Sequence, residues 1–110
     1  MPPPTPPVER WIAEARDVVG DAHVLTGRDQ VAGYAVDWTG RWGGTCPAVV
    51  RPGSTAEVAR LVDGARRHGV ALVPQGGNTG LVGGGVPSSG EVVVSLRRLD
   101  AVGDVDRTAL

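Results

Sequence analysis

The sequence predicts an α+β fold that contains a strand–helix–strand (βαβ) unit, preceded by an amino-terminal helix. Two short apolar segments, Ala48–Arg51 and Val70–Val73, flank a segment with apolar residues at helical spacing. Strands joined by a single helix at this short separation are expected to run parallel, in a right-handed crossover. A third apolar segment, Glu91–Leu96, predicts another strand of the same sheet.

The amino-terminal part holds one predicted helix and otherwise mostly irregular chain. Apolar residues recur at helical spacing over Pro6–Val19, and Gly20 follows the last of them. Val24–Leu25 is predicted as a short extended piece, Asp29–Tyr34 as a helical turn, and residues 37–46 as irregular.

The central predicted helix has recognisable ends. Ser54 and Glu57 have the spacing of a capping box, and Gly69 is suited to end the helix. The periodicity places four apolar side chains on one face of this helix: Val58, Leu61, Val62 and Ala65.

Length and composition fit one small domain or part of a larger one. The chain has 110 residues, 41% of them hydrophobic, and a formal net charge of −1. We expect a mobile proline-rich lead-in at residues 1–7, a helical and irregular part at 8–46, and a domain that begins at residue 47. Because no helix or polar tail closes residues 47–110, we expect this domain to be truncated.

The same composition excludes several classes of function. A near-neutral chain offers no basic surface, so no nucleic-acid partner is expected. No apolar segment approaches the about 20 residues of a transmembrane helix, and no secretory signal is recognisable at the amino terminus. The single Cys46 allows neither an internal disulfide nor a cysteine zinc cluster, and we expect a cytoplasmic protein.

The segment Val73–Pro87 is rich in glycine, carries no charge and follows the second predicted strand. Ligands of open α/β sheets bind beyond the carboxyl ends of strands. Successive glycines allow several peptide N–H groups to face one concavity, which suits an anion such as a diphosphate. The side chains of Gln75, Asn78 and Thr79 are candidates for further hydrogen bonds.

Two common nucleotide motifs fit this segment poorly. A Walker A loop requires a lysine, and the chain contains none. A dinucleotide fingerprint requires glycines that open a helix, whereas Gly84, Gly85 and Pro87 do not favour one. A tight connection without any ligand stays an alternative.

Several stretches carry a family resemblance. Pro74–Gly84, PQGGNTGLVGG, resembles the diphosphate-binding loop of FAD-linked oxidases of the p-cresol methylhydroxylase/vanillyl-alcohol oxidase superfamily. Residues 47–58 and 91–99 resemble the flanking elements of that family. Residues 34–38 and 41–44 resemble the branch of D-2-hydroxyglutarate and D-lactate dehydrogenases, near the FAD subunit of glycolate oxidase.

The resemblance implies the first subdomain of a PCMH-type (p-cresol methylhydroxylase-type) FAD-binding domain, with FAD as cofactor. Where this chain has Leu99-Asp100, many relatives have Met-Asn or Leu-Asn. The implied cofactor-binding residues are Pro74, Gln75, Gly76, Gly77, Asn78, Thr79, Gly80, Leu81, Gly83 and Gly84. Since no histidine lies in this segment, the implied flavin is non-covalent.

For the parent protein, the resemblance implies hydride transfer from C2 of a small 2-hydroxy acid of D configuration to flavin N5. A base and a divalent metal would assist this step from beyond residue 110. A flavoprotein or quinone would accept the electrons, and a homodimer stays open. A non-catalytic nucleotide-binding or regulatory module is the alternative.

The remaining notable side chains have simpler explanations. We expect His68 to end a helix, His23 to be solvated and Cys46 to act as a small apolar residue. For Trp38 and Trp42, contact with flavin, contact with a subunit and simple packing stay open. Trp11 is expected in the core, and the pairs Arg66-Arg67 and Arg97-Arg98 on solvated faces.

Overall fold

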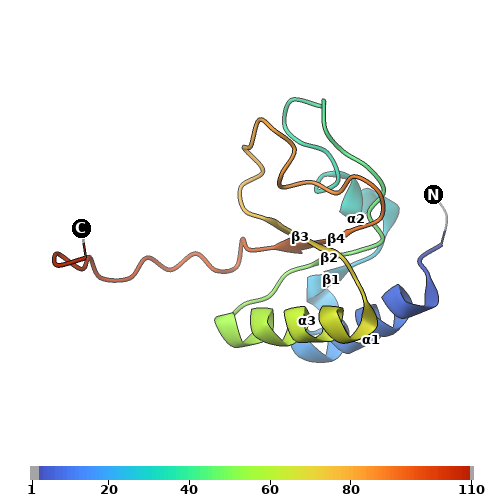
Figure 1. The fold of residues 1–110 in the computed structure, drawn as a ribbon, viewed down its shortest axis with the longest axis horizontal. Coiled ribbons are helices and arrows are strands. Elements are labelled where there is room, and N and C mark those ends of the chain that lie inside the picture. Colours follow the sequence, from blue (N-terminus) through green and yellow to red (C-terminus); the bar gives the residue numbers. More distant parts are fainter. Residues whose placement is uncertain (1–2, 110) are drawn as a thin grey trace.

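A four-stranded mixed sheet lies at the centre of the computed structural model, which describes residues 3–109 (Figure 1). The helices are α1 (Pro6–Val19), α2 (Arg28–Ala32) and α3 (Thr55–His68), with a 3-10 turn, η1 (Asp21–His23), after α1. The strands are β1 (Val24–Leu25), β2 (Val49–Val50), β3 (Leu72–Gln75) and β4 (Val92–Ser95). The predicted α+β class is confirmed.

The order of strands in the sheet is β1-β2-β4-β3. Strand β1 pairs antiparallel with β2, while β4 pairs parallel with both β2 and β3. The predicted βαβ unit is therefore present as β2–α3–β3 with parallel strands, but β4 lies between them. The crossover through α3 passes over the position of one strand.

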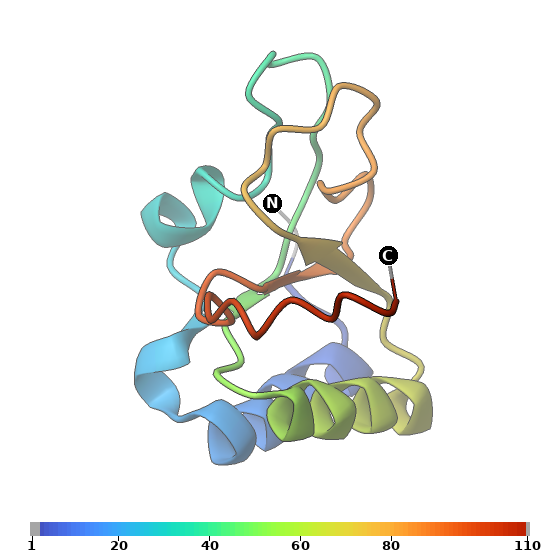
Figure 2. The same ribbon diagram turned by 90° about the vertical axis from the view of Figure 1, so that its left-hand side faces the viewer.

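The connection from β3 to β4 determines where the glycine-rich segment lies. Parallel neighbours usually need a helix to bring the chain back, but residues 76–91 return without one. Figures 1 and 2 show this segment on the side of the sheet opposite α1 and α3, beside residues 36–43.

Helices α1 and α3 pack together on one face of the sheet (Figure 2). The Trp11 side chain is 1% exposed, and its indole N–H donates to the carbonyl of Leu61 at 3.1 Å. Trp11 thus belongs to the core, as predicted. The buried residues of this cluster are Trp11, Ile12, Ala15, Val19, Val24, Ala48, Val50, Leu61, Ala65 and Val92.

The predicted ends of α3 are confirmed with one difference. The Ser54 hydroxyl accepts the Glu57 N–H at 3.1 Å, whereas the Glu57 carboxylate accepts the N–H of Gly53, at 3.1 Å. Gly69 ends the helix in the left-handed conformation, with φ of 69°. The prediction for Val62 was wrong, because this side chain is 52% exposed while Leu61 packs toward α1.

A second, smaller core cluster covers the other face of the sheet. It comprises the buried side chains of Val31, Cys46, Val49 and Val93, with Leu25, Tyr34 and Ala35 packed against them. Alternation along β2 and β4 sends neighbouring valines to opposite faces, which explains why both faces are apolar. Strand β3 is shifted by two residues from the predicted Val70–Val73, so that Pro74 and Gln75 belong to the strand and Val70 does not.

Candidate functional site

Two loops lie side by side beyond the carboxyl end of β3 (Figures 1 and 2). One is the glycine loop, residues 76–87. The other is residues 36–43, which we call the hairpin because Val36 and Gly43 form an isolated antiparallel bridge. The segment predicted as irregular therefore contains one ordered turn.

A hollow of about 240 Å³ lies among these loops. Its lining comprises Asp37, Gln75, Gly76, Gly77, Asn78, Thr79, Gly80, Gly83, Gly85 and Val86. Most of the predicted cofactor-binding residues are thus brought together. Pro74, Leu81 and Gly84 do not line the hollow, whereas Asp37, Gly85 and Val86 line it and were not predicted.

The peptide N–H groups of the glycine loop are free donors. Within residues 3–109, no N–H of residues 76–85 donates a hydrogen bond. A run of unpaired peptide donors around one concavity is the arrangement by which protein backbones bind phosphate and similar anions. The hollow therefore fits an anionic group better than an apolar one.

The glycines of this loop give a second indication that an anionic group binds in the hollow. At Gly76, Gly80, Gly84 and Gly85, an added Cβ would meet no heavy atom within 4 Å, and φ is not positive. Neither packing nor backbone conformation within the described chain requires glycine there. A ligand that lies directly against the main chain supplies a reason.

The amide side chains of Gln75 and Asn78 hold the loops together. Gln75 is 2% exposed, and its Nε2 donates to the carbonyls of Tyr34 and Gly85, at 2.8 Å each. Asn78 has a positive φ of 57°, and its Nδ2 donates to the Val36 carbonyl at 2.8 Å. These amide nitrogens already serve main-chain acceptors, which leaves the peptide N–H groups as the main free donors.

Both tryptophans of the hairpin contact the glycine loop. The indole N–H of Trp38 donates to the Thr79 carbonyl at 3.0 Å, although the side chain is 64% exposed. The ring of Trp42 lies so close to Gly83 that an added Cβ would come within 3.0 Å of it. The contact with the loop is thus observed for both side chains.

Asp37 organises the hairpin from within. Its carboxylate accepts the Thr39 hydroxyl at 2.6 Å and the Trp42 N–H at 3.2 Å. The hydrogen bond from Thr39, followed by peptide N–H groups, lowers the pKa of Asp37 although burial opposes this shift. These hydrogen bonds stabilise the charged form of Asp37 and bind its carboxylate within the hairpin.

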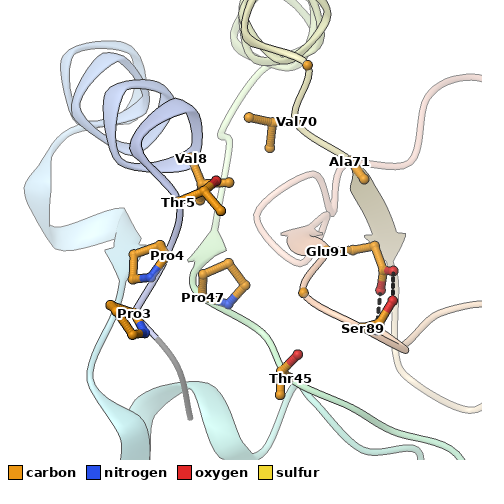
Figure 3. A pocket seen from close by; sticks show the side chains of 12 residues that line it. Pro3, Pro4, Thr5, Val8, Thr45, Pro47, Val70, Ala71, Ser89 and Glu91 are labelled. Atoms are coloured by element: carbon orange, nitrogen blue, oxygen red, sulfur yellow. Dashed lines mark hydrogen bonds between the residues drawn. The ribbon is translucent and has the colours of Figure 1, made fainter.

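A second hollow, of about 340 Å³, lies at the amino ends of β3 and β4 (Figure 3). Prolines and valines from several segments line it, including Pro4, Pro47 and Val70. Its one charged side chain, Glu91, points toward Ser89 and is bonded by the N–H groups of Ser88 and Ser89. Its lining is mainly apolar and includes the carboxylate of Glu91 but no arginine or histidine, so this hollow does not resemble an anion site.

Cys46 and the two histidines lie outside the 240 Å³ hollow. Cys46 is buried, its thiol donates to the Ala48 carbonyl, and burial raises the pKa of the thiol. His68 ends α3 with Nε2 at 2.9 Å from Glu14 of α1. His23 is half-buried rather than solvated; burial first, then the charges of Arg98 and Arg51, lowers its pKa.

The arginine pairs also lie away from the hollow. Arg67 forms ion pairs with Glu14 and Asp63, and its hydrogen bond is the main cause that lowers the pKa of Glu14. Arg98 donates to the carbonyl of Arg51 at 2.8 Å, and Arg97 lies over the ring of Tyr34. In the described chain, the contacts of these arginines thus connect parts of the fold and do not involve the hollow.

A family model described as the FAD binding domain matches residues 46–110, and the chain belongs to this family. The fold agrees, since the solved structure of p-cresol methylhydroxylase with substrate bound superposes with a TM-score of 0.79 at 21% identity. That superposition covers 94% of this chain and 21% of the other. The predicted PCMH-type fold is confirmed.

Two curated relatives carry different names. A probable mitochondrial D-2-hydroxyglutarate dehydrogenase of Oryza sativa subsp. indica is 40% identical over 87 residues, 79% of this chain and 16% of that protein. A 1'-carboxy-chondrochloren decarboxylase of Chondromyces crocatus is 44% identical over 105 residues, 91% of this chain and 19% of that protein. The chain thus spans less than a quarter of either relative's length.

Two further features are absent from residues 3–109. Residues 3–109 bring together no group of three or more His, Cys, Asp and Glu side chains suited to a metal ion. Among the helices described, none has the length and apolar character needed to cross a membrane.

Proposed function

We propose that the 240 Å³ hollow holds the diphosphate of FAD. The observation that carries this proposal is the run of unpaired peptide N–H groups over residues 76–85. Each such donor can form a charge-assisted hydrogen bond to a phosphate oxygen without the need to reorient. The open space in front of Gly76 and Gly80 allows the diphosphate to approach the main chain.

The flavin is proposed to be non-covalent. The only histidines and cysteine of the chain are His23, His68 and Cys46, and none of them lines the hollow. When the flavoprotein is precipitated with acid, the yellow colour should appear in the supernatant. Colour retained in the pellet would contradict this part of the proposal.

For the whole protein, we propose a flavin-dependent dehydrogenase of a D-2-hydroxy acid. The relatives named as D-2-hydroxyglutarate dehydrogenases support this assignment. FAD would accept the hydride from C2 of the substrate, and residues 3–109 would supply binding and orientation. The base, a divalent metal, a flavoprotein or quinone acceptor, a homodimer and a cytoplasmic location belong to the same proposal.

The relative named as a decarboxylase favours a second candidate, in which the same FAD segment serves a decarboxylase. A module that binds nucleotide without catalysis is the third. Flavin reduction by D-2-hydroxyglutarate or D-lactate in the full-length protein distinguishes the first candidate from both others. Release of carbon dioxide from a carboxylated substrate would identify the second.

Gly77→Asp tests the hollow directly. The φ of Gly77 is not positive, and an added Cβ would meet only the Thr79 methyl group, at 3.8 Å. The substitution should therefore leave folding intact and place a negative charge in the hollow. Two like charges about 4 Å apart near a protein surface repel by about 4 kcal/mol, so FAD affinity should fall at least about a hundredfold.

Gly103→Asp is the matched control, because an added Cβ there meets nothing within 4 Å and the residue is exposed. Flavin content and the FAD dissociation constant of the full-length protein are the measurements. Equal flavin binding by Gly77→Asp and the wild type would refute the assignment of the hollow.

A further inference from the structure

We propose that the hairpin, residues 36–43, is a positioning element of the FAD site and that Trp38 is its principal positioning residue. The hairpin lies outside the segment that matches the FAD-binding domain family, residues 46–110. This inference rests on the proposed function and adds residues that pre-form the diphosphate hollow before the cofactor arrives.

Two hydrogen bonds cross between the hairpin and the glycine loop in opposite directions. The Trp38 indole N–H donates to the Thr79 carbonyl at 3.0 Å, and the Asn78 amide donates to the Val36 carbonyl at 2.8 Å. Both bonds use carbonyl oxygens and side-chain donors. They hold residues 78 and 79 while leaving the peptide N–H groups of the loop free for an anion.

A glycine-rich loop without such restraint would bind weakly. Glycine loses more conformational freedom on ordering than any other residue, and a loop that is ordered only on binding reduces affinity. A loop held in its binding conformation beforehand avoids that loss. Contacts that pre-form the hollow therefore act on cofactor affinity without touching the cofactor.

The hairpin is rigid enough to serve this purpose. The Asp37 carboxylate accepts from Thr39 and Trp42, and the Asp37 N–H donates to the Trp42 carbonyl at 2.9 Å. The ring of Trp42 then lies against Gly83, at the other end of the loop. Trp38 is thus presented to Thr79 by a turn with its own internal hydrogen bonds.

The two tryptophans provide a matched pair of variants. Trp38→Phe keeps an aromatic ring on a side chain that is 64% exposed and deletes the donor to Thr79. Trp42→Phe makes the same chemical change on the same hairpin, but the Trp42 indole N–H donates to no atom of residues 3–109. Only the first variant removes a hydrogen bond to the loop.

The test measures FAD and ADP dissociation constants of the full-length protein by titration of the flavin-free form. Loss of one hydrogen bond corresponds to about three- to tenfold, so Trp38→Phe should weaken FAD by that factor. ADP also carries a diphosphate, so its dissociation constant should rise by the same factor. Trp42→Phe should stay within about twofold for both, because phenylalanine keeps the Cβ, Cγ and Cδ positions that lie against Gly83. Thermal unfolding of both flavin-free variants checks that each is folded.

The outcomes separate the two proposals. A wild-type protein that binds neither FAD nor ADP overturns the proposed function itself. A wild type that binds FAD, with Trp38→Phe binding as tightly as Trp42→Phe, overturns the positioning role alone. If Trp38→Phe does not fold, Asn78→Gly serves instead, because glycine tolerates the φ of 57° and lacks the amide donor; unchanged affinity there also overturns it.

Discussion

At the scale of single residues, Gly83 differs from the other glycines of the loop. It has a φ of 79°, and an added Cβ would lie 3.0 Å from the ring of Trp42. Gly83→Ala should therefore lower the free energy of unfolding by about 1–2 kcal/mol from the backbone conformation alone. Urea unfolding of the flavin-free protein, followed by tryptophan fluorescence, measures this loss.

Gly84→Ala is the neighbouring control. Its Cβ would meet no heavy atom within 4 Å, and its φ is not positive. The free energy of unfolding should stay the same or rise by about 0.4–1 kcal/mol, because alanine restricts the unfolded chain. A loss equal to that of Gly83→Ala would show that the positive φ of Gly83 and its contact with Trp42 do not account for the effect of that substitution.

At the scale of the element, the hairpin should respond to acid through Asp37. The hydrogen bond from Thr39 lowers the folded-state pKa of Asp37 below its ordinary value of 3.8. The stabilisation is therefore complete above the unfolded pKa and is lost as pH falls through the lower, folded pKa. We expect the fluorescence of Trp38 and Trp42 to be constant from neutral pH down to about pH 4 and to change below it.

Asp37→Asn isolates this effect from other carboxylates. Asparagine has a similar shape but is uncharged, and it cannot accept both hydrogen bonds as the carboxylate does. The hairpin of the variant should therefore be less stable already at pH 7. The acid-dependent change in the wild type should then be reduced in the variant. Identical pH profiles for the two proteins would assign the transition to other groups, such as Glu91, whose pKa is lowered mainly by the Ser88 N–H.

At the scale of the whole molecule, residues 3–109 would form only part of the FAD site that we propose. A hollow of about 240 Å³ can receive a diphosphate, whereas sites that enclose drug-sized ligands measure about 300–1,000 Å³. A chain of residues 1–110 should thus bind FAD more weakly than micromolar in calorimetry. A micromolar dissociation constant, about −8 kcal/mol, would show that this segment is a complete nucleotide-binding module.

The sheet also has different edges from those that chain order suggests. The last strand, β4, lies inside the sheet, and the edges are β1 and β3. Val92 and Leu96 donate to the carbonyls of Ala71 and Gln75, so alternation directs Pro74 toward the free edge. Proline has no N–H to offer a further strand there, which blunts the edge against association.

Local signals in the sequence determined much of this fold. The ends of α1 and α3 follow from Pro6, Ser54 and Gly69, because caps act within a few residues. The position of the glycine loop after a strand, and its resemblance to FAD-linked oxidases, also belong to a short continuous stretch. Most of the lining of the hollow could be predicted for that reason.

Only the tertiary structure decided how these pieces meet. Several strand orders satisfy the same local pattern of apolar residues. The position of β4 between β2 and β3 depends instead on how the valine side chains of the strands pack in the core. The bonds from Gln75 to Tyr34 and from Asn78 to Val36 join residues 41 and 42 positions apart. Sequence periodicity extends over one element, so contacts at that separation arise only when the packed chain brings the hairpin against the glycine loop.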